Sequence, residues 1–447
     1  MRVLFVEVDT ERSWAVASIG PGFLASYLRA RGHEVHFLRA TVDLDDAAIV
    51  ARVAAIAPEL IGVSLTTRQW LRAKDLIATI RQTVDAPVIA GGLHPTFSPE
   101  EVLAAPGFDY VCMGEGEVAM AELCDRLAAG KRVGLLTPIG NIWAKGGQKP
   151  VLRPPFEPLD DLPFLARDLL DEHHGVVHMA TQRGCPFPCT YCAARMYNQL
   201  YEGTGEYGRR RSHENVLAEL TGLKDEGRLN YVIFLDDTFT INHGWVKEFC
   251  KVYGERLHTP FSLHARVETV SDRLLPTLAG AGCTMVTYGV ESGSERIRRE
   301  VMKRPVTNQR FRDVFRWTKA SGIAITCNFM LGLPGETRED LQMTLDLAEE
   351  LIDTGGLLDF GYFVFYPYPG TQLFQECRDR GYLPDDFLTR PANHRESILN
   401  LPTLTQDDIG EFYDAFTALR RRAYADRLGA AATADTTSHV DSLALHG

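Results

Sequence analysis

The segment at residues 181–192, TQRGCPFPCTYC, places three of the nine cysteines close together, at Cys185, Cys189 and Cys192. Pro186 and Pro188 lack amide donors and keep this stretch out of a helix, so we expect the three thiols on a loop that wraps around one centre. Zinc sites usually take cysteines in C-x2-C or C-x4-C pairs, whereas iron–sulfur clusters are held by closely spaced thiolates. The C-x3-C-x2-C spacing therefore favours a cluster. The alternatives are unrelated core cysteines or a zinc site completed by one of three histidines, namely His173, His174 or His213.

The same segment resembles the cluster loop of the radical S-adenosylmethionine (SAM) superfamily, whose pattern is C-x3-C-x-aromatic-C, with Tyr191 as the aromatic residue. Three thiolates leave one iron of a [4Fe–4S] cluster without a protein ligand. The resemblance implies that the three cysteines hold this cluster at the catalytic centre and that SAM chelates the open iron. It also implies that reductive cleavage of SAM releases a 5'-deoxyadenosyl radical. The protein then holds and shields cofactors that carry the chemistry.

Composition limits the other classes of function. The chain has 447 residues, 45% of them hydrophobic and 24% charged, which is ordinary for a globular protein of two or three domains. With 47 basic against 59 acidic residues the net charge is −12, which argues against nucleic acid as a partner. We expect the one tight basic run, Arg209–Arg210–Arg211, to be a solvated or substrate-facing loop. No apolar stretch predicts a signal peptide or a membrane span, and irregularly spaced cysteines are not a disulfide framework, so we expect a cytoplasmic protein.

The first 130 residues predict a doubly wound α/β domain. Short apolar runs alternate with amphipathic helical patterns, as five βα units with a parallel sheet require. The strands are predicted at residues 3–8, 34–38, 60–65, 87–90 and 109–113, and helices at 23–31, 47–55 and 71–81. In such sheets a ligand lies across the carboxyl ends of the strands.

The loops at those strand ends resemble the Rossmann-like cobalamin-binding domain that precedes the barrel in one radical SAM subfamily. The resemblance rests on Ser64-Leu65-Thr66 and on the Gly91-Gly92 pair, which makes room for the nucleotide tail of cobalamin. It implies a set of cobalamin-binding residues: Ser64, Thr66, Gly91, Gly92, His94, Gly114 and Glu115. The loop after the first strand, residues 9–14, lacks the D-x-H-x-x-G motif, so we expect no axial histidine from it. A flavodoxin-like domain that binds nothing or only docks is the alternative.

Residues 131–174 contain scattered glycines and prolines and predict a linker with one small hairpin. From residue 175 to 385 the βα alternation resumes and predicts a partial (β/α)6 barrel of the TIM type, with active-site residues at the carboxyl ends of its strands. Strands are predicted at residues 177–182, 231–235, 262–266, 285–290, 324–331 and 360–366, and helices at 214–224, 245–253, 309–320 and 341–352. Residues 386–447 predict one amphipathic helix, at 411–427, followed by a disordered tail.

Polar residues follow the predicted barrel strands, where the family binds SAM. Carboxylates suit an ammonium group and a guanidinium suits a carboxylate. The segments at residues 288–294 and 331–337 resemble the family's G-x-E-S-G and G-x-P-G-E-T turns. The resemblance implies a set of SAM-binding residues: Tyr191, Asp236, Asp237, Arg266, Glu291 and Ser292.

These features predict a cobalamin-dependent radical SAM enzyme, implied to methylate an unactivated carbon, or phosphorus, of a small-molecule substrate. It would draw electrons from a reductant such as flavodoxin or ferredoxin. A cyclase, a ring-rearranging enzyme or an oxidising enzyme with the same cofactors is the first alternative, and a non-catalytic corrinoid or redox sensor is the second. We expect substrate specificity to depend on Trp14, on residues 198–211 and on the region after Tyr366.

Overall fold

The structure is a computed structural model that describes residues 1–447 except 11–17, 132, 135–136, 171–173, 391–393 and 429–447. The described chain divides into two compact units. Unit 1 contains Met1–Asp171, Met196–Arg209 and Tyr368–Gly370, and unit 2 contains Glu172–Arg195, Arg210–Pro367 and Thr371–Gly447. Each unit is α/β, as predicted.

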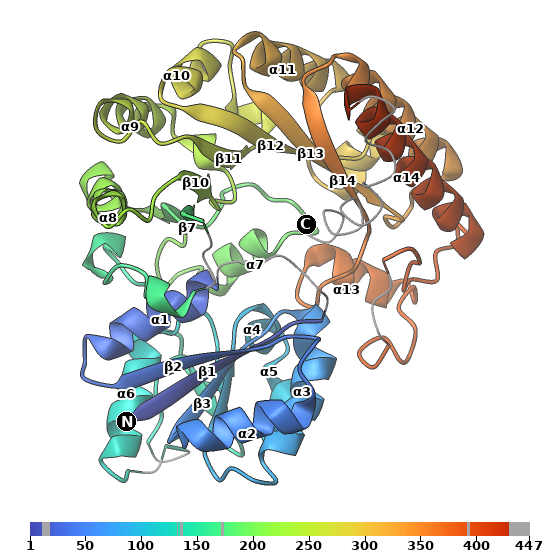
Figure 1. Ribbon diagram of the computed structural model, residues 1–447. Helices are drawn as coiled ribbons and strands as arrows, with labels where there is room; N and C mark the ends of the chain where they lie inside the picture. The colour runs from blue at the N-terminus through green and yellow to red at the C-terminus, as the bar shows by residue number, and fades with distance from the viewer. Residues whose placement is uncertain (11–17, 132, 135–136, 171–173, 391–393, 429–447) are drawn as a thin grey trace. The chain divides into compact units, whose positions relative to one another are not determined.

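Unit 1 is built on a six-stranded sheet in the order β2-β1-β3-β4-β5-β6 (Figure 1). The first five strands pair in parallel and β6 pairs antiparallel to β5. The strands are β1 (Arg2–Val8), β2 (Glu34–Ala40), β3 (Leu60–Ser64), β4 (Val88–Gly91), β5 (Tyr110–Cys112) and β6 (Ile142–Ala144). The helices are α1 (Ile19–Arg29), α2 (Asp46–Ile56), α3 (Trp70–Ile80), α4 (Leu93–Phe97), α5 (Pro99–Ala104) and α6 (Glu117–Ala128).

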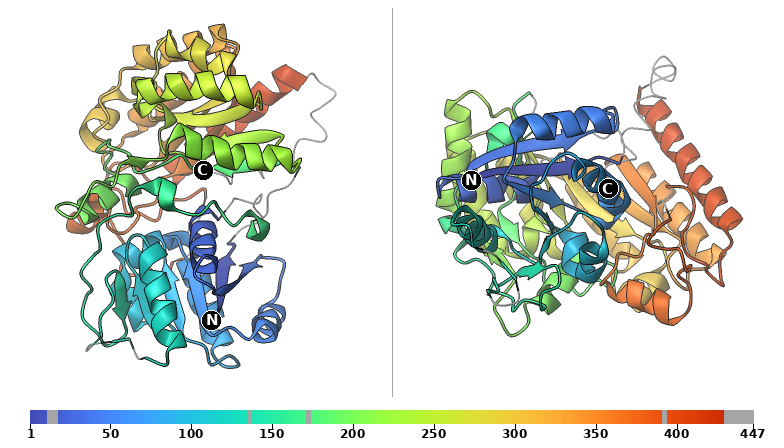
Figure 2. Two further views of the ribbon diagram at one scale, coloured as in Figure 1. Left: turned by 90° about the vertical axis from the view of Figure 1, so that its left-hand side faces the viewer. Right: turned by 90° about the horizontal axis from the view of Figure 1, so that it is seen from below.

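Two hydrophobic layers cover the two faces of this sheet. One layer joins the strands to α2, α3 and α5, and the other joins them to α1 and α6. Figure 2 shows helices on both sides of this sheet. The central strands β1 and β3 are almost continuously buried, which is typical of parallel strands covered on both sides. Local sequence also sets helix ends: the Asp45 side chain accepts a hydrogen bond from the amide of Ala48 at 2.7 Å and begins α2.

The segment predicted as a linker, residues 131–174, differs from that prediction over its described part. Up to Asp171 it groups with unit 1, where β6 extends the sheet. Leu159, Leu162 and Leu165 are buried in the layer under α1 and α6. The many prolines interrupt helical periodicity, and for that reason the composition of the segment resembles that of a linker. They do not prevent its leucines from being buried.

Unit 2 is a partial barrel of six parallel strands in the order β14-β13-β12-β11-β10-β7. The strands are β7 (Val176–Met179), β10 (Tyr231–Phe234), β11 (Phe261–Ala265), β12 (Cys283–Glu291), β13 (Ala324–Leu331) and β14 (Leu357–Val364). A separate two-stranded sheet pairs β8 (Gln182–Arg183) with β9 (Arg209–Arg210).

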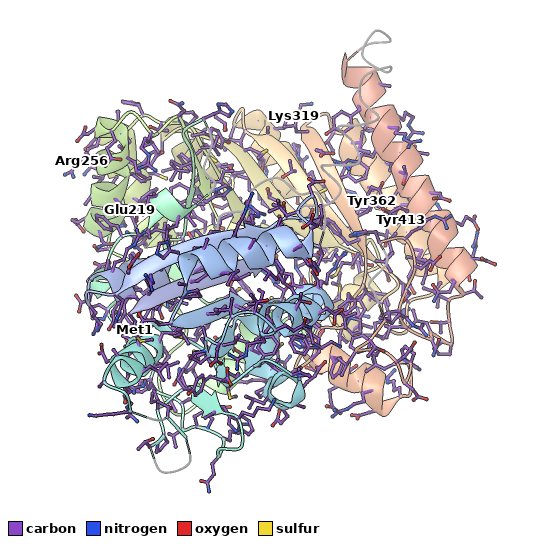
Figure 3. The ribbon with its side chains drawn as sticks, turned by 60° about the horizontal axis from the view of Figure 1, so that its bottom comes forward. Met1, Glu219, Arg256, Lys319, Tyr362 and Tyr413 are labelled. Atoms are coloured by element: carbon purple, nitrogen blue, oxygen red, sulfur yellow. The ribbon has the colours of Figure 1, made fainter. Side chains whose placement is uncertain are left out.

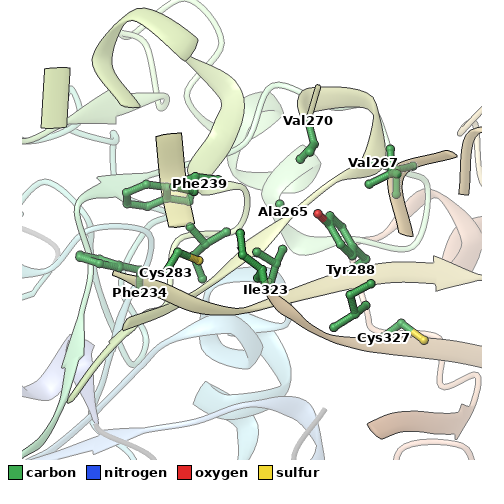
Figure 4. Close-up of a cluster of buried hydrophobic side chains, with 14 of the residues drawn as sticks. Phe234, Phe239, Ala265, Val267, Val270, Cys283, Tyr288, Ile323 and Cys327 are labelled. Atoms are coloured by element: carbon green, nitrogen blue, oxygen red, sulfur yellow. The ribbon is translucent and has the colours of Figure 1, made fainter. Parts of the chain in front are cut away.

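Helices line the outer side of this barrel (Figure 1). They are α8 (His213–Asp225), α9 (His243–Arg256), α10 (Leu274–Gly280), α11 (Asn308–Ala320), α12 (Arg338–Asp353) and α14 (Gln406–Leu428), with α13 (Gln372–Asp379) at a loop. The helix α7 (Ala193–Leu200) begins in unit 2 and continues into unit 1 at Met196. Alternate strand residues such as Phe234, Ala265, Tyr288 and Cys327 fill the layer between sheet and helices (Figure 4). Tyr362 of β14 and Tyr413 of α14 pack edge to face with ring centroids 5.0 Å apart (Figure 3).

Candidate functional site

The three cysteines lie on the loop between β8 and α7 in unit 2, as the prolines predict. The loop is fastened at its centre by Thr190, which is 1% exposed. The Thr190 hydroxyl donates to the carbonyl of Val301 at 2.7 Å, and the Thr190 carbonyl accepts from the amide of Leu373 at 3.1 Å. Two distant segments therefore fix the loop that carries the cysteines. The side chains of Cys185 and Cys189 are buried, and that of Cys192 is half-buried.

None of these three cysteines forms a disulfide. Among the described residues, no group of three or more His, Cys, Asp or Glu side chains is placed to hold one metal ion, which a zinc site requires. His213 instead hydrogen-bonds the Trp245 carbonyl at 3.0 Å, and His173 lies outside the described residues. Separate thiols on one loop fit a multi-iron cluster, which binds each thiolate through a different iron.

Burial keeps the thiols of Cys185 and Cys192 protonated when no metal is bound. It raises the pKa of Cys192 to about 12, and the nearby Asp237 carboxylate adds to this effect. Burial also raises the pKa of Cys185. Because only thiolates bind metal, cluster assembly must release these protons.

Asp236, which follows β10, supports the segment that leads into the cysteine loop. One carboxylate oxygen accepts from the backbone amides of Thr181 at 2.7 Å and Gln182 at 2.8 Å, and the other accepts from the Thr181 hydroxyl at 2.6 Å. Burial raises the pKa of Asp236 to about 6. Its side chain is thus engaged within the protein, whereas the neighbouring Asp237 side chain is exposed and can meet a ligand.

A chain of charged residues begins at the cysteine loop. The Arg266 guanidinium donates from Nη1 to the Cys189 sulfur at 2.9 Å and from Nη2 to the Glu268 carboxylate. Glu268 also accepts from Arg304 Nη2 at 3.2 Å. Burial opposes ionisation of Glu268, yet Arg304 and Arg266 together lower its pKa. Glu268 is therefore the anion that joins the two arginines.

The chain of charges returns to the loop through Glu291 at the end of β12. Arg304 Nη1 lies 3.8 Å from Glu291 Oε1, and the Tyr191 hydroxyl donates to the same oxygen at 3.5 Å. Burial raises the pKa of Glu291. The structure thus brings Tyr191, Arg266 and Glu291 together with the cysteines, and the sequence indicates neither Glu268 nor Arg304 as a member of the group.

Glu291 adopts a backbone conformation that is rare for a residue with a side chain. Its φ is 70°, and the pairing of β12 with β13 shifts register between Gly289 and Glu291. A Cβ atom at Gly289 would lie 2.3 Å from Glu291 Oε1, so a side chain there would displace the Glu291 carboxylate. Strained backbone of this kind concentrates at functional sites. Ser292, by contrast, is fully buried, with its hydroxyl 3.3 Å from that of Thr344, and supports the turn from inside.

In unit 1 the glycines at the end of β4, Gly91 and Gly92, differ in whether the fold requires them. Gly92 has φ 99°, and a Cβ atom there would lie 2.7 Å from the Leu65 carbonyl, so the fold itself demands glycine. At Gly91 the nearest atom to a Cβ would be Cys112 Cβ, at 3.8 Å. The fold itself therefore does not demand glycine at Gly91, which pairs with Ser64 at the carboxyl edge of the sheet. Thr66 is exposed at the same edge, where its hydroxyl donates to Gln69 Oε1 at 3.0 Å.

His94 lies inside unit 1. Its side chain is 0% exposed and stacks on Trp70 with ring centroids 5.0 Å apart. The Trp70 indole donates to Glu101 Oε1 at 2.5 Å, and His94 Nε2 lies 3.6 Å from Glu101 Oε2. Burial lowers the pKa of His94 to about 4, so the imidazole is neutral at physiological pH.

Gly114 and Glu115 are covered by the segment Met196–Arg209, which belongs to unit 1. The Tyr201 hydroxyl accepts from the Glu115 amide at 2.7 Å and lies 2.2 Å from where a Cβ atom of Gly114 would be. Arg209 donates to the two oxygens of Glu115 at 2.5 and 3.0 Å. These two predicted cobalamin residues therefore bind this segment of the protein, a partnership that the sequence does not signal.

The basic run at residues 209–211 is not solvated, in contrast to the prediction. Arg209 and Arg211 are 6% and 5% exposed. Arg211 pairs with Glu219 at 2.7 Å, and the guanidinium of Arg210 lies 4.3 Å from the ring centroid of Trp245. Arg209 and Arg210 thus have partners far away in sequence, at Glu115 and Trp245, which a local charge pattern cannot reveal.

Comparison with known proteins agrees with this division. Residues 179–348 match the family model of the radical SAM superfamily, and residues 15–124 match that of the B12 binding domain. An uncharacterized methyltransferase from Pyrococcus horikoshii is 30% identical over 84% of this chain and 83% of its own length. An anaerobic magnesium-protoporphyrin IX monomethyl ester cyclase from Rubrivivax gelatinosus is 26% identical over 85% of this chain and 70% of its own. The fold is similar to that of the radical SAM methyltransferase TsrM from Kitasatospora setae, with a TM-score of 0.69, 18% identity and coverage of 85% of this chain and 75% of that one.

Proposed function

Because the chain belongs to the cobalamin-dependent radical SAM methyltransferase family, we propose that it methylates an unactivated carbon or phosphorus centre of a small-molecule or natural-product intermediate. The observation that carries this proposal is the cysteine loop of unit 2, which Thr190 holds in place. Tyr191 of this loop contacts Glu291 at the carboxyl end of β12. Polar groups at the strand ends of a barrel are where its chemistry takes place.

When bound, the cluster and SAM supply a radical that removes hydrogen from the substrate, and cobalamin supplies the methyl group. We assign Cys185, Cys189 and Cys192 to the cluster. We assign Asp237 to the ammonium group of SAM because its carboxylate is exposed next to the loop. Tyr191 and Glu291 complete the polar contacts with SAM, while Asp236 and Ser292 hold the backbone in place.

For cobalamin we assign the edge formed by Ser64, Thr66 and Gly91. Gly91 places no side chain at that edge, although the fold itself would accept one, since the nearest atom to its missing Cβ is Cys112 Cβ at 3.8 Å. The other predicted cobalamin residues support the loops at this edge through contacts within unit 1; they are Gly92, His94, Gly114 and Glu115. Among the described residues no helix has the length and hydropathy to cross a membrane. We infer a cytoplasmic enzyme that receives electrons from a flavodoxin or ferredoxin.

A cyclase that uses the same cofactors is the second candidate, because the relative from Rubrivivax gelatinosus carries that name. One experiment separates the two. The reconstituted protein is incubated anaerobically with SAM, a reductant and candidate substrates, and both 5'-deoxyadenosine and S-adenosylhomocysteine are measured. Methylation produces both compounds when substrate is present, whereas cyclisation produces 5'-deoxyadenosine without S-adenosylhomocysteine. Formation of neither, with a fully loaded protein, would contradict the assignment to an enzyme.

A further inference from the structure

Arg266 is placed differently from what its position at the end of β11 predicts. Its guanidinium lies over the ring of Phe187, 3.9 Å from the centroid, and Phe187 stands within the cysteine loop between Cys185 and Cys189. Nη1 donates to the Cys189 sulfur at 2.9 Å. Two separate contacts therefore hold the guanidinium against the cysteine loop.

The hydrogen bonds that Arg266 makes within the protein disfavour a bidentate contact with the carboxylate of SAM. Bidentate recognition of a carboxylate needs two adjacent N–H groups of one guanidinium. Nη1 is directed to Cys189 and Nη2 to Glu268, while Nε is buried without a protein partner. Each nitrogen keeps one N–H group, so a bidentate contact with the carboxylate of SAM would have to share Nη1 or Nη2 with Cys189 or Glu268.

We propose that Arg266 is a positioning residue that raises the reduction potential of the cluster by donating a hydrogen bond to the Cys189 sulfur. This inference rests on the proposed function, because it requires a cluster on Cys189. Hydrogen bonds to the sulfurs and positive charge near them favour the reduced, more negative state of an iron–sulfur cluster. A cluster that must pass an electron to SAM has to be reduced by the cell's donors first, so this contact bears on the first step of turnover.

The surrounding charges hold Arg266 in this place. Glu268 binds both Arg266 and Arg304, and Arg304 is 1% exposed and fixed to Glu291 as well. The carboxylate between two arginines keeps the guanidinium of Arg266 from swinging towards solvent. A lysine at position 266 would keep the charge but lose the planar fork that serves the sulfur and Glu268 together.

The test is a redox titration of the reconstituted full-length protein with dithionite, without SAM, in which electron paramagnetic resonance measures the reduced cluster. The variants are Arg266→Gln and Arg266→Lys. The control is Arg420→Gln, which removes a more deeply buried arginine of unit 2 that pairs with Asp359 on β14. SAM affinity is measured on the same samples by calorimetry.

We expect the midpoint to move to more negative values in Arg266→Gln, by a tenfold or larger change in the ratio of reduced to oxidised cluster, about 59 mV for one electron. Arg266→Lys should fall between Arg266→Gln and the parent protein, and Arg420→Gln should match the parent. An unchanged midpoint in both Arg266 variants, together with weakened SAM binding, would overturn the inference and return Arg266 to the SAM carboxylate. Failure of the parent protein to assemble any [4Fe–4S] cluster would instead overturn the proposed function.

Discussion

The carboxylate of Asp236 binds Thr181 twice, through the backbone amide at 2.7 Å and through the side-chain hydroxyl at 2.6 Å. Thr181 precedes the cysteine loop by four residues, so Asp236 sets the start of the loop from another strand. Asp237, the next residue, is exposed. The two adjacent aspartates therefore have separable roles.

We expect Asp236→Asn to destabilise the fold by about 2–4 kcal/mol, because an amide offers one acceptor where three donors converge. Urea unfolding and iron content after reconstitution measure the effect. Asp237→Asn is the matched variant, and it should keep stability and iron while weakening SAM binding. If Asp236→Asn retains full stability and iron content, Asp236 does not support the loop.

Replacing Cys185, Cys189 and Cys192 together with alanine should remove iron and the broad visible absorbance of the cluster, because no thiolate remains to bind it. Iron analysis and absorption spectroscopy measure the loss. Cys250→Ala changes a buried thiol of α9 and should retain iron, at a stability cost of about 1–2 kcal/mol. Stoichiometric zinc without iron in the anaerobically reconstituted parent protein would refute the cluster.

The glycine pair at the end of β4 offers a test of cobalamin binding. Gly91→Ala should fold normally, because its Cβ would have no neighbour closer than 3.8 Å, yet bind cobalamin at least tenfold more weakly. Gly92→Ala should lower the thermal midpoint instead, because its φ of 99° and the nearby Leu65 carbonyl exclude a side chain. Cobalamin titration and thermal unfolding separate the two effects. Unchanged cobalamin affinity in Gly91→Ala would contradict the assignment of cobalamin to that edge of the sheet.

Bound cob(II)alamin should give an electron paramagnetic resonance spectrum without nitrogen superhyperfine splitting. The described part of the loop after β1 carries no histidine, and the side chain of His94 is enclosed against Trp70. His94→Gln should therefore leave the spectrum unchanged, although the loss of stacking should reduce stability. A triplet splitting that disappears in His94→Gln would identify His94 as an axial ligand.

The buried Glu336 predicts a pH dependence of stability. One of its oxygens accepts from the amides of Gly332 at 2.7 Å and Leu333 at 3.0 Å, and burial raises its pKa to about 8 from an ordinary value of 4.5. A raised carboxyl pKa means that the folded state retains the proton that the unfolded state has lost. The associated stability is present below pH 4.5 and is lost as the pH rises through 8.

Relative to Glu336→Gln, the wild-type protein should lose about 1.4 kcal/mol of unfolding free energy per pH unit within that window. Urea unfolding at a series of pH values measures the two slopes. Parallel slopes in the two proteins would show that Glu336 is ionised in the folded state at neutral pH.

The sequence predicts the strands of both units because their apolar runs are local features. Residues 324–331 coincide with β13, and the other predicted strands lie within a few residues of the observed ones. The cysteine loop is predicted for the same reason, since its pattern lies within a few residues. The sequence predicts less well which polar residues at strand ends contact a ligand. Asp236, Ser292 and Glu115 instead contact other groups of the protein.

That difference has a physical cause. Whether a carboxylate at a strand end faces a ligand depends on donors that arrive from elsewhere in the chain, as Arg209 does for Glu115 and the amide of Thr181 does for Asp236. Arg304, which binds Glu268 and Glu291, sits between a π-helical turn (Ile297–Val301) and α11 with no periodicity to mark it. Such partners become visible only when the fold is known.

The segment Met196–Arg209 begins four residues after Cys192 but is built into unit 1, where Tyr201 and Arg209 close over the end of β5. Unit 1 is therefore not a contiguous stretch of chain. A fragment that ends before the cysteine loop would lack these two residues and expose the amide of Glu115 and its carboxylate. If the N-terminal half were exchanged between relatives at a single crossover, Glu115 would come from one protein and its partners Tyr201 and Arg209 from the other. A stable chimaera must therefore take residues 196–209 from the same protein as the rest of unit 1.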